Sequence, residues 1–593
     1  MDLRASAANT RIWRGGKIEE SVGEGSGLAR ALDGAGAGQL ASLLAEGVDA
    51  VELDDGEVEL RVDRQPGGMA RVRTRWRTGE EAVSDIPLAV PVADLVAALH
   101  DGSRALHWRD GAWFEGIPSG SAAFILPVVA PDRLGSGGFR AAHNVRYAYA
   151  AGAMAGGIAS AELVLALGNA GMLGYFGSGG LSVEAVEAAL IRIGAEGKGR
   201  PFGFNLLHNP AEPAVESRTV DLYIEHGVRD VDASAFMGLT PSVVRYRLHG
   251  IHEANGEIVV PNRVSAKVSR PEVAEPFMRP APEKLLAELV AAGTITAAQA
   301  RLAKNVPIAE DITAEADSGG HTDRRPLPVL IPIFRRLADR VTAEQGYGTR
   351  IRVGAAGGIG DPWSFAAALQ LGADYVMTGS VNQCTPEAAT SDDVKQMLAQ
   401  AGFADVIEGP APDMFEIGAQ VQVLARGTLY AQRAARLYEL YRAYNGIEAI
   451  PEADRARVEK QIFQRPLLEV WAETEAYWRV RDVREVERAA AEPRHRMALT
   501  FRWYLGMSSR WARMGEISRK RDYQVWCGPA MGSFNDWVRG SHLEPVGARG
   551  VVTVAHALLH GACGALRVHA VRTAGIPLPM GADDIRPGGG RSS

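Results

Sequence analysis

Gly319, Gly320 and His321 form a short group of residues that could do chemistry. They follow the run "DITAEAD" (311–317), which is typical of a short buried strand. Two glycines let a flat ligand lie against bare backbone, and the histidine then places one titratable ring beside it. A tight turn followed by a solvated histidine would explain the same residues, so their meaning depends on where the strand ends.

Two further glycine motifs follow in the chain. Gly357 and Gly358 end the run "IRVGAAGG", and Gly379 and Ser380 end the run "ADYVMTGS". Backbone amides at the start of a short helix can bind a phosphate without any side chain, and we expect such a helix to begin near Asp361-Pro362. Ordinary loop glycines are the alternative. Together the two motifs predict a phosphate-bearing ligand.

Two polar residues lie within other predicted strands. Asn205, in "GFNLL", carries an amide that can donate and accept, as the edge of a flavin ring or its ribityl chain requires. A turn or capping amide would explain it equally well. Lys267, in "SAKVS", is predicted to point inward, where it needs an anionic partner or a cofactor oxygen. The alternative is a surface lysine with a packed stem.

Small residues near the first predicted strand offer room for a flat ring. Gly152, Met154 and Ala155 lie in "YAYAAGAMAGG", where a ring could stack on the backbone. Close packing between helices would need the same small residues. We therefore predict these three as cofactor contacts, with helix packing as the alternative.

Eight short apolar or small-residue runs, most of them followed by a helical stretch, occur between Tyr147 and Ser380. The runs are "YAYAAGAM", "MLGYFGSGG", "PFGFNLL", "VRDVDAS", "RVSAKVS", "DITAEAD", "IRVGAAGG" and "ADYVMTGS". This alternation predicts parallel strands joined by helical crossovers, and eight units match a TIM (β/α)₈ barrel. A doubly wound open sheet is the alternative, weakened because no glycine-rich fingerprint follows the first strand. In a barrel, the carboxyl ends of the strands form one catalytic face, which would bring the three glycine motifs together.

The rest of the chain is divided by its composition. We expect an N-terminal α+β region at 1–138, the barrel at 139–412 and a C-terminal helical region at 413–578, followed by a disordered tail at 579–593. A helical insertion at about 271–309 follows the fifth strand; it is predicted as a lid over the site, with a plain surface excursion as the alternative.

Composition and charge exclude several classes of protein. With 46% hydrophobic residues and a net charge of −7, the chain is predicted to be globular and not a general nucleic-acid binder. Its three cysteines, Cys384, Cys527 and Cys563, show no ligand spacing, so neither a metal site nor a disulfide framework is expected. We find neither a secretion signal nor an apolar stretch long enough for a membrane, which predicts a cytoplasmic protein.

The motifs resemble those of the nitronate monooxygenase/2-nitropropane dioxygenase superfamily of FMN barrels. The resemblance is closer to the PfaD family, the separately encoded enoyl reductases of polyunsaturated fatty acid synthases and trans-acyltransferase polyketide synthases. It extends from about Phe139 to about Arg572 and is carried by "AEADSGGHTDRRP", "RVGAAGGIGDP", "LGADYVMTGSVNQCTPEA" and "DYQVWCGPAMGSFNDWV".

The resemblance implies FMN as a hydride relay from NADPH to an enoyl thioester on an acyl carrier protein. It implies that His321 is the active-site histidine and that the flavin phosphate lies at Gly357, Gly358, Gly379 and Ser380, with Asn205 and Lys267 matching further flavin contacts. The implied partners are the carrier protein and synthase subunits, and a Trp-rich C-terminal region is compatible with a homodimer.

Three different functions compete with this one. The first is that of the nitronate-oxidising flavoproteins of the same superfamily, which use the equivalent histidine as a base. The second is a flavin-free scaffold subunit of a synthase, and the third is a phosphosugar-type barrel enzyme.

An acidic carrier protein could be steered by a basic cluster in the C-terminal region, with a solvated helix face as the plainer explanation. The cluster comprises Arg494, Arg496, Arg502, Arg510, Arg513, Arg519, Lys520 and Arg521.

Overall fold

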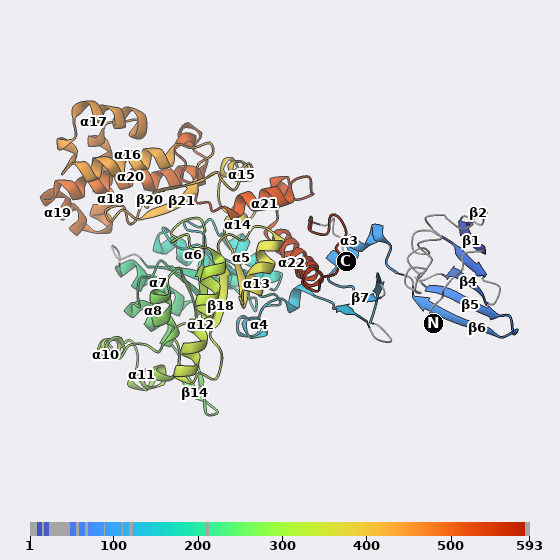
Figure 1. Ribbon diagram of the computed structural model, residues 1–593. Helices are drawn as coiled ribbons and strands as arrows, with labels where there is room; N and C mark the ends of the chain where they lie inside the picture. Colours follow the sequence, from blue (N-terminus) through green and yellow to red (C-terminus); the bar gives the residue numbers. More distant parts are fainter. Residues whose placement is uncertain are drawn as a thin grey trace. The chain divides into compact units, whose positions relative to one another are not determined.

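The computed structural model of the chain forms two compact units (Figure 1). The first, here called the N-terminal unit, comprises Met1–Pro131 with His560–Ile585, and the second, the barrel unit, comprises Asp132–Leu559 with Arg586–Ser593. The residues described are 9–14, 17–22, 48–54, 58–65, 69–87, 89–109, 111–117, 122–208 and 213–587. Part of the segment in which a secretion signal was not expected, and the last six residues of the predicted tail, lie outside these ranges.

The barrel unit is built on a closed barrel of eight parallel strands. In order they are β10 (Tyr149–Ala151), β11 (Leu173–Phe176), β12 (Gly203–Leu207), β13 (Asp230–Ser234), β16 (Arg263–Val268), β17 (Asp311–Glu315), β18 (Arg352–Ala356) and β19 (Tyr375–Thr378). Each of the eight predicted runs contains one of these strands, so the TIM barrel prediction is confirmed. The three glycine motifs therefore follow adjacent strands, the sixth, seventh and eighth.

Helices between the strands bury their apolar faces against the barrel. They are α5 (Ala161–Asn169), α6 (Val183–Glu196), α7 (Pro213–Glu225), α8 (Pro241–Leu248), α12 (Leu327–Gln345) and α13 (Pro362–Gln370). Local sequence fixes where several of them begin: the side chains of Ser160, Ser182 and Thr240 each accept a hydrogen bond from a backbone amide in the first turn.

A network of buried charges closes the floor of the barrel, at the amino ends of the strands. Strand register places Asp230 beside Arg263 and Asp311 beside Arg352. Each pair forms two hydrogen bonds of 2.6–2.7 Å. His143, the last residue of α4 (Gly137–His143), lies between the two carboxylates, with Nδ1 2.6 Å from Asp230 and Nε2 3.1 Å from Asp311.

The charge on His143 stabilises this floor. Burial alone would lower the pKa of its imidazole, but Asp311 and Asp230 outweigh burial and raise it to about 9. The pKa of each carboxyl is held below its usual range, since His143 and an arginine offset the cost of burial. The network thus joins four strands, β13, β16, β17 and β18, through mostly buried side chains.

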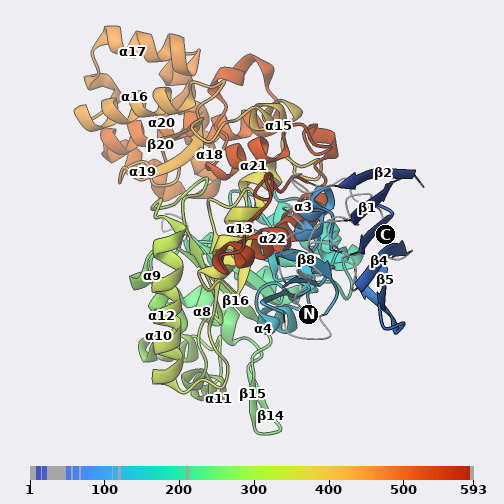
Figure 2. The same cartoon turned by 45° about the vertical axis from the view of Figure 1, so that its right-hand side comes forward.

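The insertion after the fifth strand is helical, as predicted. It consists of α9 (Pro271–Met278), α10 (Glu283–Ala291) and α11 (Ala297–Leu302). α9 runs along α12 (Figure 2), α10 contacts α8, and α11 contacts the hairpin of β14 (His252–Ala254) and β15 (Glu257–Val259). These contacts lie on the outer helices, so the predicted role as a lid must be judged by which residues line the cavity.

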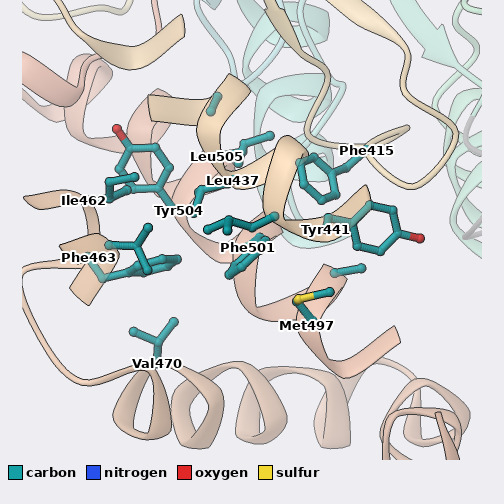
Figure 3. Packing of buried hydrophobic residues seen from close by; sticks show 14 of the residues in the cluster. Phe415, Leu437, Tyr441, Ile462, Phe463, Val470, Met497, Phe501, Tyr504 and Leu505 are labelled. Carbon is teal, nitrogen blue, oxygen red and sulfur yellow. The ribbon is translucent and has the colours of Figure 1, made fainter. Parts of the chain in front are cut away.

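The part of the chain after the barrel adds a β-hairpin and a group of helices. β20 (Val406–Pro410) pairs with β21 (Gln420–Leu424), and α14 (Ser380–Gln383), α15 (Asp392–Ala399) and α21 (Ala530–Val538) lie near the barrel's carboxyl end. The helical group is made of α16 (Tyr430–Ala443), α17 (Glu452–Val458), α18 (Leu467–Arg481), α19 (Val483–Ala491) and α20 (Pro493–Met514). Their shared core is rich in aromatic residues, including Phe415, Phe463, Phe501 and Tyr504 (Figure 3). This confirms the predicted C-terminal helical region.

In its described residues, the N-terminal unit combines strands with one helix of its own and part of a second. A six-stranded sheet has the order β2-β1-β3-β4-β5-β6, and a smaller sheet has the order β8-β7-β9. The strands are β1 (Asn9–Arg14), β2 (Lys17–Val22), β3 (Ala50–Asp54), β4 (Val58–Gln65), β5 (Met69–Trp76), β6 (Glu81–Pro87), β7 (Leu106–Arg109), β8 (Ala112–Glu115) and β9 (Phe124–Leu126), with α3 (Val92–His100) between the sheets in sequence.

The end of the chain completes this unit. Arg567, in α22 (Val551–Thr573), is fully buried and donates hydrogen bonds to the carbonyl oxygens of Leu99 at 2.9 Å and Pro127 at 2.5 Å. Within the segment predicted as a disordered tail, Ala582 and Ile585 are buried. Residues 560–585 therefore contribute core contacts to a unit that otherwise consists of the first part of the chain.

α22 also bears on the expectation that no segment could cross a membrane. Among the described residues it is the one helix long and apolar enough to do so by length and composition. However, 61% of its most apolar window is buried inside the protein, as in a packed core helix. Its apolar character is thus explained by packing, and the sequence search had missed it.

The floor network predicts a pH-dependent loss of stability. His143→Gln removes the buried cation between two carboxylates and should lower the free energy of unfolding by about 3 kcal/mol at pH 6.5. Because the pKa of His143 is raised from 6.5 to about 9 by folding, its contribution is complete below pH 6.5 and disappears as the pH rises through about 9. Urea unfolding of wild type and variant should therefore converge at high pH. A difference in the free energy of unfolding between wild type and His143→Gln that does not change with pH would contradict this assignment. His252→Gln, at an exposed histidine, is the control.

Candidate functional site

A cavity lies at the carboxyl ends of the barrel strands, with about 1080 Å³ of empty space including its open mouth. All of the predicted site residues line it: Gly152, Met154, Ala155, Asn205, Lys267, Gly319, Gly320, His321, Gly357, Gly358, Gly379 and Ser380. No residue of the insertion at 271–309 does so, and the expected lid role therefore finds no support. The cavity is covered instead by Trp526 and Ala530 from the C-terminal part.

The Gly-Gly-His loop is held between two segments from beyond the barrel. Gly320 has a φ of +88° and exchanges two backbone hydrogen bonds of 3.1 Å with Gln422 of β21. On the other side the backbone of Cys527 approaches so closely that a Cβ on Gly319 would lie 2.8 Å from its nitrogen. The second glycine thus supplies a positive φ, and the first supplies space for another backbone.

His321 is mostly buried in the wall of this cavity. Its Nε2 lies 2.9 Å from Oδ1 of Asp413, and the ring of Trp526 packs edge-on at 6.3 Å between centroids. Burial lowers the pKa of His321, but the hydrogen bond and charge of Asp413, with the charge of Glu315, raise it above its usual value. Its surroundings in the wall therefore favour the protonated imidazole over the neutral one.

Lys267 lies between two carboxylates near the base of the cavity. Its Nζ is 3.6 Å from Glu315 and 4.0 Å from the buried Asp232. Burial alone would lower the pKa of Lys267, but the charges of Glu315 and Asp232 raise it. The prediction that this lysine points inward is confirmed, and its anionic partners belong to the protein itself.

Asn205 is oriented by hydrogen bonds within the barrel. Its Nδ2 donates to the carbonyl oxygen of Asp232 at 2.9 Å and to Oγ of Ser234 at 3.0 Å. Because both amide hydrogens are used in this way, only Oδ1 remains to accept a hydrogen bond from a ligand. The geometry narrows the prediction, which had allowed the amide both to donate and to accept.

The glycines after the seventh and eighth strands leave open space on the cavity side. A Cβ on Gly358 or Gly379 would meet no atom within 4 Å, whereas one on Gly357 would lie 2.7 Å from the carbonyl carbon of Ala316. A ligand group can thus approach bare backbone at Gly358 and Gly379, while Gly357 permits the close contact between neighbouring turns.

The helix expected at the phosphate site needs correction. α13 does begin at Pro362, but the Asp361 side chain accepts hydrogen bonds from the amides of Trp363 and Ser364. With these amides capped by a carboxylate, the start of α13 is a poor place for an anion. The backbone facing the cavity after the eighth strand belongs to Gly379 and the short helix α14, and the hydroxyl of Ser380 accepts a 3.0 Å hydrogen bond from Gly528.

Comparison with known proteins shows the family to which the chain belongs. The sequence family described as nitronate monooxygenase matches residues 140–409, and the inserted helical domain of [acyl-carrier-protein] S-malonyltransferase matches 444–523. The enoyl reductase domain of MlnA, from the macrolactin biosynthesis cluster of Bacillus amyloliquefaciens, is 37% identical, with a TM-score of 0.71 over 74% of this chain and 99% of that domain. The chain belongs to the PfaD family of the nitronate monooxygenase superfamily.

Two curated relatives agree with the PfaD assignment. A subunit of the polyunsaturated fatty acid synthase of a Thraustochytrium species is 46% identical over 464 residues, which cover 77% of this chain and 31% of the relative. Polyketide biosynthesis protein PksE of Bacillus subtilis is 46% identical over 418 residues, covering 70% of this chain and 54% of PksE. The chain thus spans between about a third and a half of the length of these two relatives.

Several residues at the PfaD-family site were missed by the sequence search. Asp413, Gln422 and Trp526 lie far along the chain from the strand ends. The segment before α21 brings Trp526 to the cavity, and the folded hairpin brings Asp413 to His321 and Gln422 to Gly320. Glu315 could have been found, since it lies in the same strand as the Gly-Gly-His loop. Among the described residues, no group of three His, Cys, Asp or Glu side chains could hold a metal ion.

Three members of the basic cluster, Arg502, Arg513 and Arg519, are held by contacts inside the protein. Arg513 is half-buried and donates a 2.6 Å hydrogen bond to the carbonyl oxygen of Gly156, while Arg519 is buried and bonds Ile462 at 2.7 Å. Arg502 donates to Pro412 at 2.9 Å. Arg502 and Arg519 thus bond within the C-terminal part, and Arg513 bonds the loop after β10. Reversing the charge of Arg513 or Arg519 would therefore test folding rather than docking. The plainer explanation of a helix face with internal contacts is favoured.

The close backbone contact at Gly319 generates a prediction. Gly319→Ala places a methyl group against the backbone of Cys527, which cannot move as a side chain would, and should lower the free energy of unfolding by about 2 kcal/mol. It should also displace the His321 loop. Gly348→Ala, at an exposed glycine whose added Cβ meets nothing within 4 Å, is the matched control. Equal thermal stability of the two variants would contradict a tight contact at Gly319.

Proposed function

We propose that the chain is an FMN-dependent enoyl reductase that acts on enoyl thioesters carried by an acyl carrier protein, with NADPH as the hydride donor. The observation that supports this most is the cavity itself. The Gly-Gly-His loop and the open glycines of the last two strands line one space, in a chain 37% identical to an enoyl reductase domain over nearly the whole length of that domain. The synthase relatives support a role in polyketide or polyunsaturated fatty acid synthesis.

The residues present fit FMN. Gly358 and Gly379 leave open backbone where a phosphate could approach, which requires no side chain. Gly152 and Ala155 line the same cavity with little bulk, as a flat ring needs, and Met154 lies beside them. Asn205 retains one acceptor toward the cavity. When bound, FMN would relay a hydride from NADPH to the β-carbon of the substrate.

His321 would supply the matching proton. As the hydride reaches the β-carbon, the α-carbon gains a proton and the double bond becomes a single bond, while NADPH is oxidised. The raised pKa of His321 favours the protonated ring, which can donate this proton or polarise the thioester carbonyl. Trp526 lines the cavity beside the ring, edge-on to it.

The proposed partners follow from the relatives. The two relatives are named as a synthase subunit and a polyketide biosynthesis protein, and the match to the inserted helical domain of a carrier-protein transferase supports an acyl carrier protein as the bearer of the substrate. A cytoplasmic location is part of the same proposal.

A phosphate at Gly379 would make this glycine essential for the cofactor. Gly379→Ala adds a methyl group to open space with φ at −131°, so the protein without cofactor should be as stable as wild type. Its affinity for FMN should fall by about tenfold, because the methyl group occupies the space of the phosphate. Fluorescence titration of apoprotein with FMN measures this, with Gly348→Ala as control. An unchanged affinity for FMN would contradict a phosphate site at Gly379.

The reaction itself is tested by anaerobic stopped-flow. NADPH should bleach the flavin of the loaded wild type, and an enoyl thioester on its carrier protein should restore the colour. His321→Ala should keep its flavin and the first step but lose about 10²- to 10⁴-fold in the second. Exposed His252→Ala is the control. Failure of wild type to react with the thioester, together with rapid oxygen uptake on a nitronate, would favour the oxidase instead.

A further inference from the structure

The hydrogen-bond partner of His321 comes from outside the barrel. Asp413 lies in the loop between β20 and β21, 92 residues further along the chain, and its Oδ1 is 2.9 Å from Nε2 of the imidazole. Neither the sequence motifs nor the barrel architecture requires a carboxylate at this position. The pairing must therefore be explained by what holds the loop there.

The loop around Asp413 is fixed at both ends and in the middle. Ala411 donates a 2.8 Å backbone hydrogen bond to Ala419, which closes the loop. Arg502, on α20, donates a 2.9 Å hydrogen bond to the carbonyl oxygen of Pro412, the residue next to Asp413. The helical group thus sets the position of the carboxylate.

The same hairpin also holds the histidine loop. Gln422 of β21 exchanges two backbone hydrogen bonds with Gly320, and its Nε2 donates to Asp317 at 2.9 Å. One hairpin therefore fixes both partners of the pair: the imidazole through the backbone beside it, and the carboxylate through its own turn. Such double anchoring leaves little freedom for the ring to rotate.

We propose that Asp413 is the positioning residue of His321: by accepting the hydrogen bond from Nε2, it turns Nδ1 toward the cavity as the nitrogen that meets the substrate. The proton transfer in this inference rests on the proposed enoyl reduction. The orientation of the ring can be tested without assuming that reaction. Asp413 itself does not line the cavity, so it acts through His321.

The charges around His321 agree with this role. The groups that face it are Asp413 from the hairpin, Glu315 from β17 and Lys267 from β16, with the uncharged ring of Trp526 beside it. Burial and Lys267 lower the pKa of His321, whereas Asp413 and Glu315 raise it, and the net direction is upward. Burial raises the pKa of Asp413, but His321 and Arg502 outweigh this and hold it below its usual range.

The proton balance of the step is simple. The imidazolium carries one proton on each nitrogen; the proton on Nδ1 passes to the α-carbon while the hydride reaches the β-carbon. The neutral ring keeps its Nε2 proton, bound to Asp413, which remains a carboxylate throughout. Reprotonation of Nδ1 from solvent restores the starting state.

The orientation is tested first on wild type. Full-length FMN-loaded protein with ¹⁵N-labelled histidine, its His321 signal assigned by loss in His321→Gln, should show the neutral ring above its pKa as the Nε2–H tautomer. A ring that carries its proton on Nδ1 instead would overturn the proposal. The tautomer is read from wild type, and His321→Gln serves only to assign the signal.

The second test compares Asp413→Asn with Glu408→Gln. The amide in Asp413→Asn keeps an acceptor oxygen but loses the charge, so the pKa of His321 should fall by about one unit, and the high-pH limb of enoyl reduction should move down equally. Flavin content and reduction by NADPH should not change. Glu408 is an exposed residue of β20 paired with Arg324, and neutralising it removes the same charge without touching His321; its titration should match wild type.

The outcomes separate the two proposals. An unchanged pKa of His321 in Asp413→Asn, or equal shifts in both variants, would overturn the positioning role. The pKa of His321 could fall in Asp413→Asn while wild type fails to reduce enoyl thioesters. That result would keep Asp413 as the positioning residue and overturn the proposed function. Asp413→Glu, which keeps the charge on a longer side chain, should restore most of the pKa and part of the rate.

Discussion

The site depends on a backbone contact rather than on any single side chain. Gly319 and Gly320 are pressed between β21 and the segment around Cys527, and neither contact would survive an ordinary side chain: one position needs a positive φ and the other has no room for a Cβ. This constraint fixes the direction in which His321 leaves the strand. It also joins the barrel to the C-terminal part, so the catalytic face is completed by residues that a bare barrel would lack.

Much of this arrangement could be predicted from sequence because barrel geometry makes it local. Once eight strands are recognised, the residues at their carboxyl ends must meet, which is why Gly152, Asn205, Lys267 and His321 share one cavity. The glycine positions could be predicted in the same way. What these residues bind stays a prediction, since geometry shows only that they come together.

The features that were missed depend on long-range packing, or on a side chain that occupies the backbone groups a ligand would need. Asp413 and Trp526 reach His321 through a hairpin and a loop whose paths no local pattern reveals. The place of the insertion in the chain predicts a lid, but its helices pack against α8 and α12. The start of a helix at Asp361 predicts an anion site, although a carboxylate before Pro-x-Ser is itself the natural cap of that helix.

The N-terminal unit has a consequence for how the protein is made. Its core needs residues 560–585, and the guanidinium of Arg567 finds its acceptors in α3 and near Pro127. During synthesis from the amino end, this unit cannot be completed until the ribosome has passed residue 585, by which time the whole barrel has emerged. The residues before 132 must therefore wait, with Leu99 and its neighbours exposed, for a segment that is made after the barrel.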